Sequence, residues 1–160
     1  MIRRLTVGSP VGPLTLAERD GALVRIAFGD GGACDRTPLL DDAARQLAEY
    51  FDGRRRVFDL PLAPDGTPFQ REVWQALREI PYGQTRSYKQ IAAAVGRPQA
   101  CRAVGMANNR NPLPIVVPCH RVVGASGALT GYAGGLEIKS KLLQLEGCNS
   151  LKFKIQNFPL

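Results

Sequence analysis

A stretch near the middle of the chain, Pro61-Leu62-Ala63-Pro64-Asp65-Gly66, constrains the possible folds more than any other feature of the sequence. Proline lacks the backbone N–H that helices and central strands use, and glycine weakens both, so neither element is expected to run through these residues. The chain has 160 residues, a length that can bury about 70% of the unfolded surface. We therefore predict two folded units, residues 1–63 and 64–147, followed by a tail over residues 148–160.

The residues before this break predict an α/β unit. Apolar residues separated by Gly-Pro and Asp-Gly turns indicate a three-stranded antiparallel sheet with strands over residues 3–7, 14–17 and 23–28. Apolar residues then recur at helical spacing over 39–51, and Asp52-Gly53 ends this helix. The segment 57–60 predicts a further strand.

The second half predicts a helical unit. Thr67 begins a capping box with proline at the first helical position, and Ser87 begins a second capping box whose helix stops at Gly96. A third helix is expected over residues 99–108. The short connection 96–99 between two short helices is typical of a helix-turn-helix, here winged-helix-like, although short helical hairpins also occur in proteins that never bind DNA.

The third predicted helix has two different sides. At 100° per residue, Ala100, Ala103, Val104 and Ala107 cluster on one side. Arg102 and Asn109 then lie opposite them, toward solvent or a ligand. An ordinary alanine-rich amphipathic helix with a solvated arginine is the alternative interpretation.

The positive charge of the chain is concentrated in this region. The sequence has 21 Lys and Arg against 14 Asp and Glu, a formal net charge of +7. No acidic residue lies between Glu79 and Glu137, whereas this interval holds six basic residues: Arg86, Lys89, Arg97, Arg102, Arg110 and Arg121. Such asymmetry favours a polyanionic partner, nucleic acid first, although it also increases solubility.

The cysteines predict free thiols rather than a metal site. The four cysteines form no CxxC pair, and the chain has a single histidine, whereas a structural zinc site usually needs closely paired Cys or His ligands. We expect neither metal nor cofactor. No apolar run approaches the roughly 20 residues of a membrane span, and no signal-peptide pattern follows Met1. We therefore expect a cytoplasmic protein with no membrane partner.

The most specific string of the sequence ends in a cysteine followed by that histidine. The β-branched run 115–117 reaches Pro118, which favours an extended Val117 and a thiol presented from a constrained turn at the end of a strand. An unperturbed thiol is only about 3% ionised at pH 7, so a nucleophilic Cys119 needs a base or a positive charge nearby. His120 is a candidate base, and Arg121 carries a positive charge. A buried structural cysteine beside an incidental histidine is the alternative.

The segment Pro118-Cys119-His120-Arg121-Val122 resembles the active-site signature of the O6-alkylguanine-DNA alkyltransferases, the methylated-DNA–protein-cysteine methyltransferases. The resemblance runs without a gap from about Phe69 to Gly147, and residues 1–63 resemble the family more loosely. Flanking motifs stand at the family's spacing: Asn111-Pro112, Ser126-Gly127, Gly131-Tyr132, Gly134-Gly135 and Leu142-Leu143-x-x-Glu146-Gly147.

The resemblance implies roles in catalysis for four residues. Cys119 would take the alkyl group from guanine O6 by direct displacement. His120 would act as the base through a water, and Glu146 would orient its imidazole. Tyr88 would help to rotate the nucleotide out of the duplex and would donate a hydrogen bond to the leaving base.

The resemblance also implies contacts with DNA and substrate. Arg102 would enter the minor groove and fill the gap left by the flipped nucleotide, and Asn111 would join the recognition helix to the cysteine strand. The glycine-rich loop 130–135 would form one wall of the guanine pocket. Further candidate DNA- or substrate-binding residues are Ser87, Arg121, Tyr132, Ala133 and Gly134.

These inferences predict a monomeric DNA-repair protein that transfers the alkyl group irreversibly to Cys119, once per molecule. Its substrate would be double-stranded DNA with O6-alkylguanine, bound through the minor groove, and O4-alkylthymine is a further candidate substrate. One alternative is an alkyltransferase-like sensor that binds alkylated guanine without reacting, although such members lack the cysteine. A Cys-His hydrolase is another alternative, but adjacent residues are poorly placed for the direct hydrogen bond of such a dyad.

Overall fold

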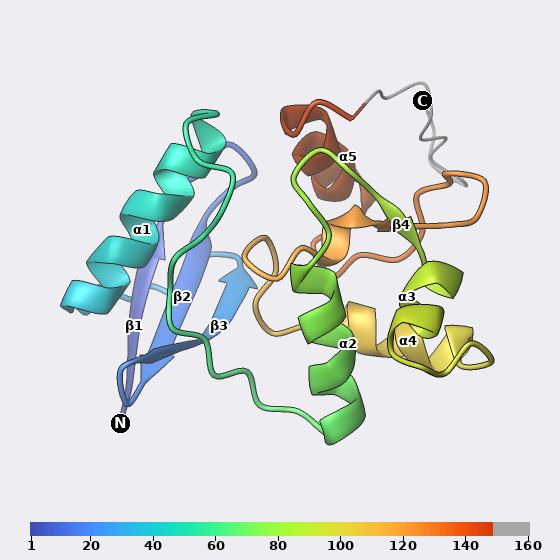
Figure 1. Ribbon diagram of the computed structural model, residues 1–160. Helices are drawn as coiled ribbons and strands as arrows, with labels where there is room; N and C mark the ends of the chain where they lie inside the picture. Colours follow the sequence, from blue (N-terminus) through green and yellow to red (C-terminus); the bar gives the residue numbers. More distant parts are fainter. Residues whose placement is uncertain (149–160) are drawn as a thin grey trace. The chain divides into compact units, whose positions relative to one another are not determined.

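The structure is a computed structural model that describes residues 1–148 (Figure 1). The chain divides into two compact units, Met1–Asp65 and a second unit that begins at Gly66. The division thus falls two residues after the boundary that the sequence predicted. Apart from Cys148, the predicted tail lies outside the described residues.

The first unit contains the predicted three-stranded antiparallel sheet. Its strands follow the order β1-β2-β3. Asp20 and Gly21 both have positive φ angles, 53° and 78°, and they form the tight connection between the last two strands. The pairing of these last two strands is interrupted by a register shift between Ala17 and Glu18. The strands are β1 (Ile2–Val7), β2 (Leu14–Arg19) and β3 (Ala22–Phe28).

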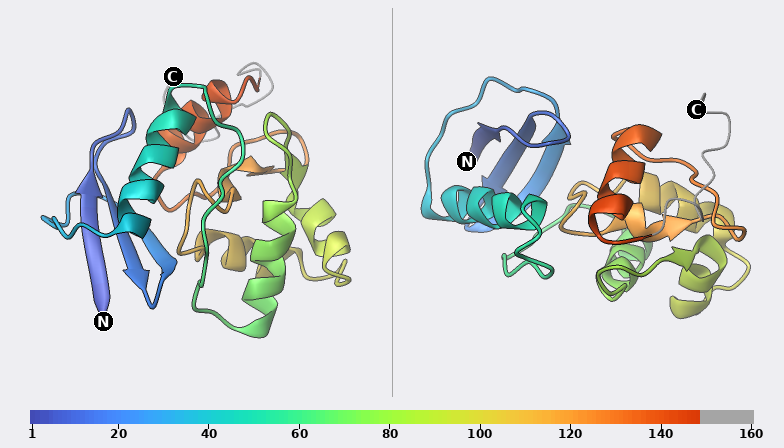
Figure 2. Two further views of the ribbon diagram at one scale, coloured as in Figure 1. Left: turned by 60° about the vertical axis from the view of Figure 1, so that its left-hand side comes forward. Right: turned by 90° about the horizontal axis from the view of Figure 1, so that it is seen from above.

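One helix, α1 (Pro38–Phe51), covers a face of this sheet and contacts all three strands (Figures 1 and 2). The Thr37 hydroxyl caps its N-terminus by accepting a hydrogen bond from the Leu40 N–H at 3.0 Å. The helix buries an apolar stripe against buried leucines of β2. This unit confirms the predicted sheet-plus-helix organisation.

The strand predicted over residues 57–60 is absent from the structure, where only an isolated bridge joins Leu62 to Leu23. A buried helix side chain takes the place of a neighbouring strand. The Gln46 amide accepts a hydrogen bond from the Asp59 N–H at 2.8 Å and donates one to the Asp59 carbonyl at 2.9 Å. Because Gln46 satisfies both backbone groups, the segment needs no second strand beside it.

The second unit begins with three helices packed against one another, α2 (Pro68–Arg78), α3 (Tyr88–Ala94) and α4 (Cys101–Asn109). Both predicted capping boxes are present. Thr67 caps α2 with Gln70, and Ser87 caps α3 with Gln90, each through a reciprocal pair of hydrogen bonds.

The helices α3 and α4 form the predicted helix-turn-helix, with a longer connection than expected. Gly96, at φ 75°, ends α3 in a Schellman motif, because the Arg97 N–H bonds the Ala92 carbonyl and the Gly96 N–H bonds the Ala93 carbonyl. The helix α4 begins at Cys101 rather than at residue 99. A turn between Ala100 and Arg97 occupies the intervening residues.

The remaining elements of the second unit hold the predicted active-site string. A two-stranded parallel sheet pairs β4 (Arg86–Ser87) with β5 (Val122–Val123). A short 3₁₀ helix, η1 (Cys119–Arg121), leads directly into β5. The helix α5 (Leu136–Leu145) follows and ends at Glu146. The chain therefore places Cys119 between the strand β5 and the turns that precede η1.

Candidate active site

The turns before Cys119 replace the strand that the sequence predicted there. Residues 114–116 form a turn, and the Val117 N–H donates to the Leu113 carbonyl at 2.9 Å. Ile115 has φ 76°, which is unfavourable for a β-branched residue. The side chain of Asn111 holds this conformation, because it donates to the Val117 carbonyl at 2.8 Å and accepts from the Leu113 N–H at 3.0 Å. An extended strand would lose these local bonds.

Two residues of α4 also connect to the rest of the site. Asn108 is buried, and its amide donates to the Cys119 carbonyl at 3.4 Å. The indole N–H of Trp74 donates to the Ala107 carbonyl at 2.8 Å. Asn108 and Asn111 thus connect the end of α4 to the Cys119 turn, whereas the Trp74 bond connects α4 to α2.

His120, Glu146 and Arg121 form one buried cluster. His120 Nε2 lies 2.7 Å from Glu146 Oε2, and Arg121 Nε lies 2.7 Å from Glu146 Oε1. Burial disfavours the charged form of Glu146, but the hydrogen bonds and charges of His120 and Arg121 outweigh it and lower its pKa to about 2. The carboxylate is therefore ionised at neutral pH.

This carboxylate decides which nitrogen of His120 carries the proton. An ionised carboxylate only accepts hydrogen bonds, so Nε2 must donate to Glu146 and Nδ1 carries the lone pair in the neutral ring. Burial also lowers the pKa of His120, against the influence of Glu146, which keeps the ring neutral at pH 7. Nδ1 is buried and makes no hydrogen bond to any residue within 1–148. It is the nitrogen that can accept a proton.

Arg121 does not have the exposed position expected of a DNA-binding residue. It is only 6% exposed. Besides its two bonds to Glu146, it donates to the Ile80 carbonyl at 2.7 Å, and its guanidinium lies over the Tyr82 ring. Because these partners occupy the guanidinium inside the unit, Arg121 is not available to contact DNA as predicted. Instead it supports Glu146.

Cys119 is 3% exposed, and burial raises the pKa of its thiol to about 11. At this value only about one molecule in ten thousand carries a thiolate at pH 7. A hydrogen bond with Asn111 and the charge of Lys139 act in the opposite direction. The resting site thus holds a thiol, which must transfer its proton to a base before it can attack.

Lys139 is a residue of the site that the sequence reasoning missed. Its side chain is fully buried, and burial lowers its pKa to about 8. The ammonium donates to the Thr130 carbonyl at 2.6 Å and lies 3.4 Å from the Gly131 carbonyl. The sequence spacing could have indicated this burial. Lys139 lies three and four residues before the buried Leu142 and Leu143, and therefore on the apolar side of α5.

Tyr88, the first residue of α3, lies beside the glycine-rich loop. Its hydroxyl donates to the Thr130 carbonyl at 3.3 Å and accepts a hydrogen bond from the Thr130 hydroxyl at 3.0 Å. Ser87, the preceding predicted DNA-binding residue, uses its hydroxyl to cap α3 at the Gln90 N–H. Both side chains are half-buried.

The outer side of α4 and the loop carry the remaining predicted residues. Arg102 and Asn109 are exposed, as expected, whereas Ala103 is exposed contrary to prediction, because the packed side consists of Val104, Ala107 and Asn108. A Cβ placed on Gly131 would lie 3.0 Å from the Asn109 amide, so the loop backbone approaches α4 closely here. Of the other loop residues, Ala133 is exposed, and Tyr132 and Gly134 are partly buried.

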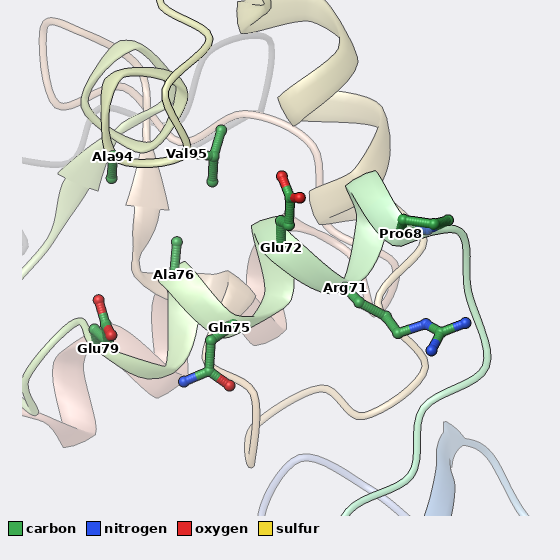
Figure 3. A pocket seen from close by; sticks show the side chains of 8 residues that line it. All are labelled: Pro68, Arg71, Glu72, Gln75, Ala76, Glu79, Ala94 and Val95. Carbon is green, nitrogen blue, oxygen red and sulfur yellow. The ribbon is translucent and has the colours of Figure 1, made fainter.

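A groove between α2 and the end of α3 contains none of these residues. Figure 3 shows its lining side chains, which include two carboxylates and none of the predicted site residues: Pro68, Arg71, Glu72, Gln75, Ala76, Glu79, Ala94 and Val95. This groove therefore does not contribute to the chemistry of Cys119.

Residues 1–148 contain neither a membrane-spanning helix nor a cluster of metal-ligating side chains. Within residues 1–148, no helix combines the length and apolar character needed to cross a bilayer. Among the same residues, no three side chains of His, Cys, Asp or Glu are grouped to hold a metal ion.

The comparisons with known proteins agree across both units. Residues 2–64 match the ribonuclease-like domain of 6-O-methylguanine DNA methyltransferase, and residues 68–148 match its DNA-binding domain. A methylated-DNA–protein-cysteine methyltransferase of Methanosarcina barkeri is 52% identical over 151 residues, which are 89% of this chain and 96% of that protein. The constitutive enzyme of that name from Bacillus subtilis is 52% identical over 153 residues, covering 88% and 93%.

Solved structures give the same result. The Mycobacterium tuberculosis OGT crystallised in complex with DNA superposes with a TM-score of 0.83 at 46% identity, covering 94% of this chain and 97% of that chain. With both domains matched in order and relatives about half identical over nearly their whole length, the chain belongs to the 6-O-methylguanine DNA methyltransferase family.

Proposed function

We propose that this protein repairs DNA by transferring the alkyl group of O6-alkylguanine to the sulfur of Cys119. The single observation that carries the proposal is the buried arrangement of Cys119 beside His120, whose ring is oriented by an ionised Glu146. Relatives that are 52% identical bear the name methylated-DNA–protein-cysteine methyltransferase, and a structural neighbour was solved with DNA. DNA is accordingly the partner of this chain.

The reaction balances without a cofactor. The Cys119 thiol loses its proton to Nδ1 of His120 through a water, and the imidazolium is stabilised by Glu146. The thiolate attacks the alkyl carbon, so that a C–S bond forms as the bond between that carbon and guanine O6 breaks. The electron pair of the broken bond remains on the guanine, and Tyr88 donates a hydrogen bond to this leaving base. The guanine anion takes up one proton and leaves as neutral guanine, and the His120 imidazolium loses the proton that came from Cys119 and returns to its neutral form.

The product explains why each molecule acts once. A thioether has no leaving group that water displaces under mild conditions, and the proposed steps contain no second nucleophile to release the alkyl group. All the groups named lie in one chain, so we infer that the monomer suffices. The same site accepts O4-alkylthymine in this proposal, since that base also carries an alkyl group on an exocyclic oxygen.

The exposed side of α4 provides the DNA contact in this proposal. Arg102 projects from the helix opposite its packed side, where an inserted side chain can replace a nucleotide rotated into the site. The minor groove admits such insertion with little dependence on base sequence. The backbone of the loop 130–135 then faces the extruded base.

The stoichiometry of the reaction tests the proposed function. With excess duplex containing O6-methylguanine, mass spectrometry is expected to find one added methyl group, on the peptide that contains Cys119, and repair should stop at one equivalent. Repeated turnover would contradict the mechanism and favour a hydrolase. Binding of the damaged duplex with no added mass would favour a sensor that does not react.

A second experiment separates base flipping from chemistry. Arg102→Ala should slow the repair of duplex DNA, because unstacking a base costs a few kcal/mol and the exposed arginine offsets part of it. The reaction with a free O6-substituted guanine should remain within about twofold of wild type, since no base is extruded. Rate constants from single-turnover assays on both substrates measure the difference.

Arg78→Ala is the matched control, because it removes the same charge from an exposed position on α2. It should leave both rate constants nearly unchanged. An equal loss on duplex and free base in Arg102→Ala would instead show that Arg102 supports the thiol or the fold, against the proposed role.

A further inference from the structure

We propose that Thr130 is a positioning residue for Tyr88, holding the phenol oxygen in place and leaving its proton available to the extruded base. The inference deepens the proposed function and rests on it. No role followed for Thr130 from the sequence beyond its place at the start of the glycine-rich loop.

The hydrogen bonds between the two residues determine the direction of each proton. The Tyr88 hydroxyl has one proton, which it donates to the Thr130 carbonyl at 3.3 Å. The Thr130 hydroxyl therefore acts as the donor in the second bond, to the Tyr88 oxygen at 3.0 Å. The threonine side chain occupies the acceptor side of the phenol, so an extruded base competes only with the Thr130 carbonyl for the phenol proton.

The bond that Tyr88 must give up is the weaker of the two. At 3.3 Å it is longer than most hydrogen bonds between hydroxyl and carbonyl oxygens. The same Thr130 carbonyl accepts a bond from the buried Lys139 ammonium at 2.6 Å. When Tyr88 turns its proton to a base, this carbonyl is still hydrogen-bonded, so no buried acceptor is left unpaired.

The bond from Thr130 also strengthens Tyr88 as a donor. A hydroxyl that accepts a hydrogen bond becomes a better donor in turn. Burial raises the pKa of Tyr88, whereas the Thr130 hydroxyl acts to lower it. The ring lies beside α4, because a Cβ on Gly105 would lie 3.9 Å from two of its atoms.

Two substitutions isolate the hydroxyl of Thr130. Thr130→Val keeps the branched shape but removes the donor, and Thr130→Ser keeps the donor. On a duplex with O6-methylguanine, we expect Thr130→Val to lower the single-turnover rate constant roughly three- to tenfold, the effect of one net hydrogen bond. Thr130→Ser should remain within about twofold of wild type.

The Tyr88→Phe background tests whether the effect passes through the phenol. There the threonine has no oxygen to position, so adding Thr130→Val should cause no further loss. A wild-type rate in Thr130→Val would overturn the proposal. So would an equal loss in Thr130→Ser, or a full additional loss beside Tyr88→Phe, because either would show that Thr130 serves only the packing of the loop.

A spectroscopic measurement keeps this proposal separate from the proposed function. With ¹³C-labelled tyrosine, the Cζ signal that disappears in Tyr88→Phe belongs to Tyr88. It should shift in Thr130→Val and return in Thr130→Ser, whether or not the protein transfers alkyl groups. An unmoved signal in Thr130→Val would refute the contact, whereas failure of wild type to methylate Cys119 would refute the function alone.

Discussion

Cys119→Ala is expected to abolish alkyl transfer while the protein still binds damaged duplex. The substitution removes the only atom that the proposed reaction alkylates, so the single-turnover rate should fall to background. The exposed side of α4 is unchanged, and Arg102 remains available to the DNA. A transfer assay with labelled O6-methylguanine duplex and a binding titration at the same salt concentration measure the two properties.

The other cysteines provide the matched controls. Cys34 is exposed and Cys101 is partly exposed, whereas Cys119 is buried. Simple accessibility would therefore direct an alkyl group to Cys34, as is expected for a small reagent such as iodoacetamide. Cys34→Ala should transfer from DNA at the wild-type rate. Transfer that survives in Cys119→Ala, or that is lost in Cys34→Ala, would contradict the assignment of the nucleophile.

Glu146→Gln is expected to lower the transfer rate by about 10²- to 10⁴-fold, the usual contribution of acid–base catalysis. A neutral amide neither stabilises the imidazolium of His120 nor enforces the tautomer with its lone pair on Nδ1. The change also leaves the buried guanidinium of Arg121 without its carboxylate. We expect a loss of about 3–5 kcal/mol in the free energy of unfolding.

A second variant separates catalysis from stability. Combining Glu146→Gln with Arg121→Met removes both charges of the ion pair, which should restore much of the lost stability. The rate should stay low, because His120 still lacks its carboxylate. Recovery of the rate together with the stability would show that Glu146 supports only the fold.

The pH dependence of unfolding gives an independent check on Glu146. Its folded-state pKa, about 2, lies below the ordinary value of 4.5, so the unfolded chain binds more protons between these values. The contribution of Glu146 to stability is therefore complete above about pH 5 and is lost as the pH falls toward 2. Denaturant titrations should show this loss in wild type, and a smaller loss in Glu146→Gln.

The elements that were correctly predicted from the sequence are those fixed by hydrogen bonds between residues close together in the chain. The capping boxes at Thr67 and Ser87, the stop at Gly96 and the Asp20-Gly21 turn each satisfy their backbone groups within a few positions. Such local bonds are available in any tertiary context. Cys119 and its neighbours could likewise be identified in the sequence because they are contiguous, although their roles came from the resemblance to a family rather than from spacing.

What the sequence by itself determined is thus the α/β fold class, most helix starts and stops, and the contiguous string that contains the candidate nucleophile. The tertiary structure alone decided where the buried polar groups find partners. Arg121 faces inward because Glu146 and the Ile80 carbonyl lie there, and Lys139 is buried because the Thr130 carbonyl accepts a hydrogen bond from its ammonium. The segment 57–60 is not a strand because Gln46, which lies 13 residues before Asp59 on the packed side of α1, bonds the backbone of Asp59. Desolvation makes such partners obligatory, but only the folded chain determines which residues meet.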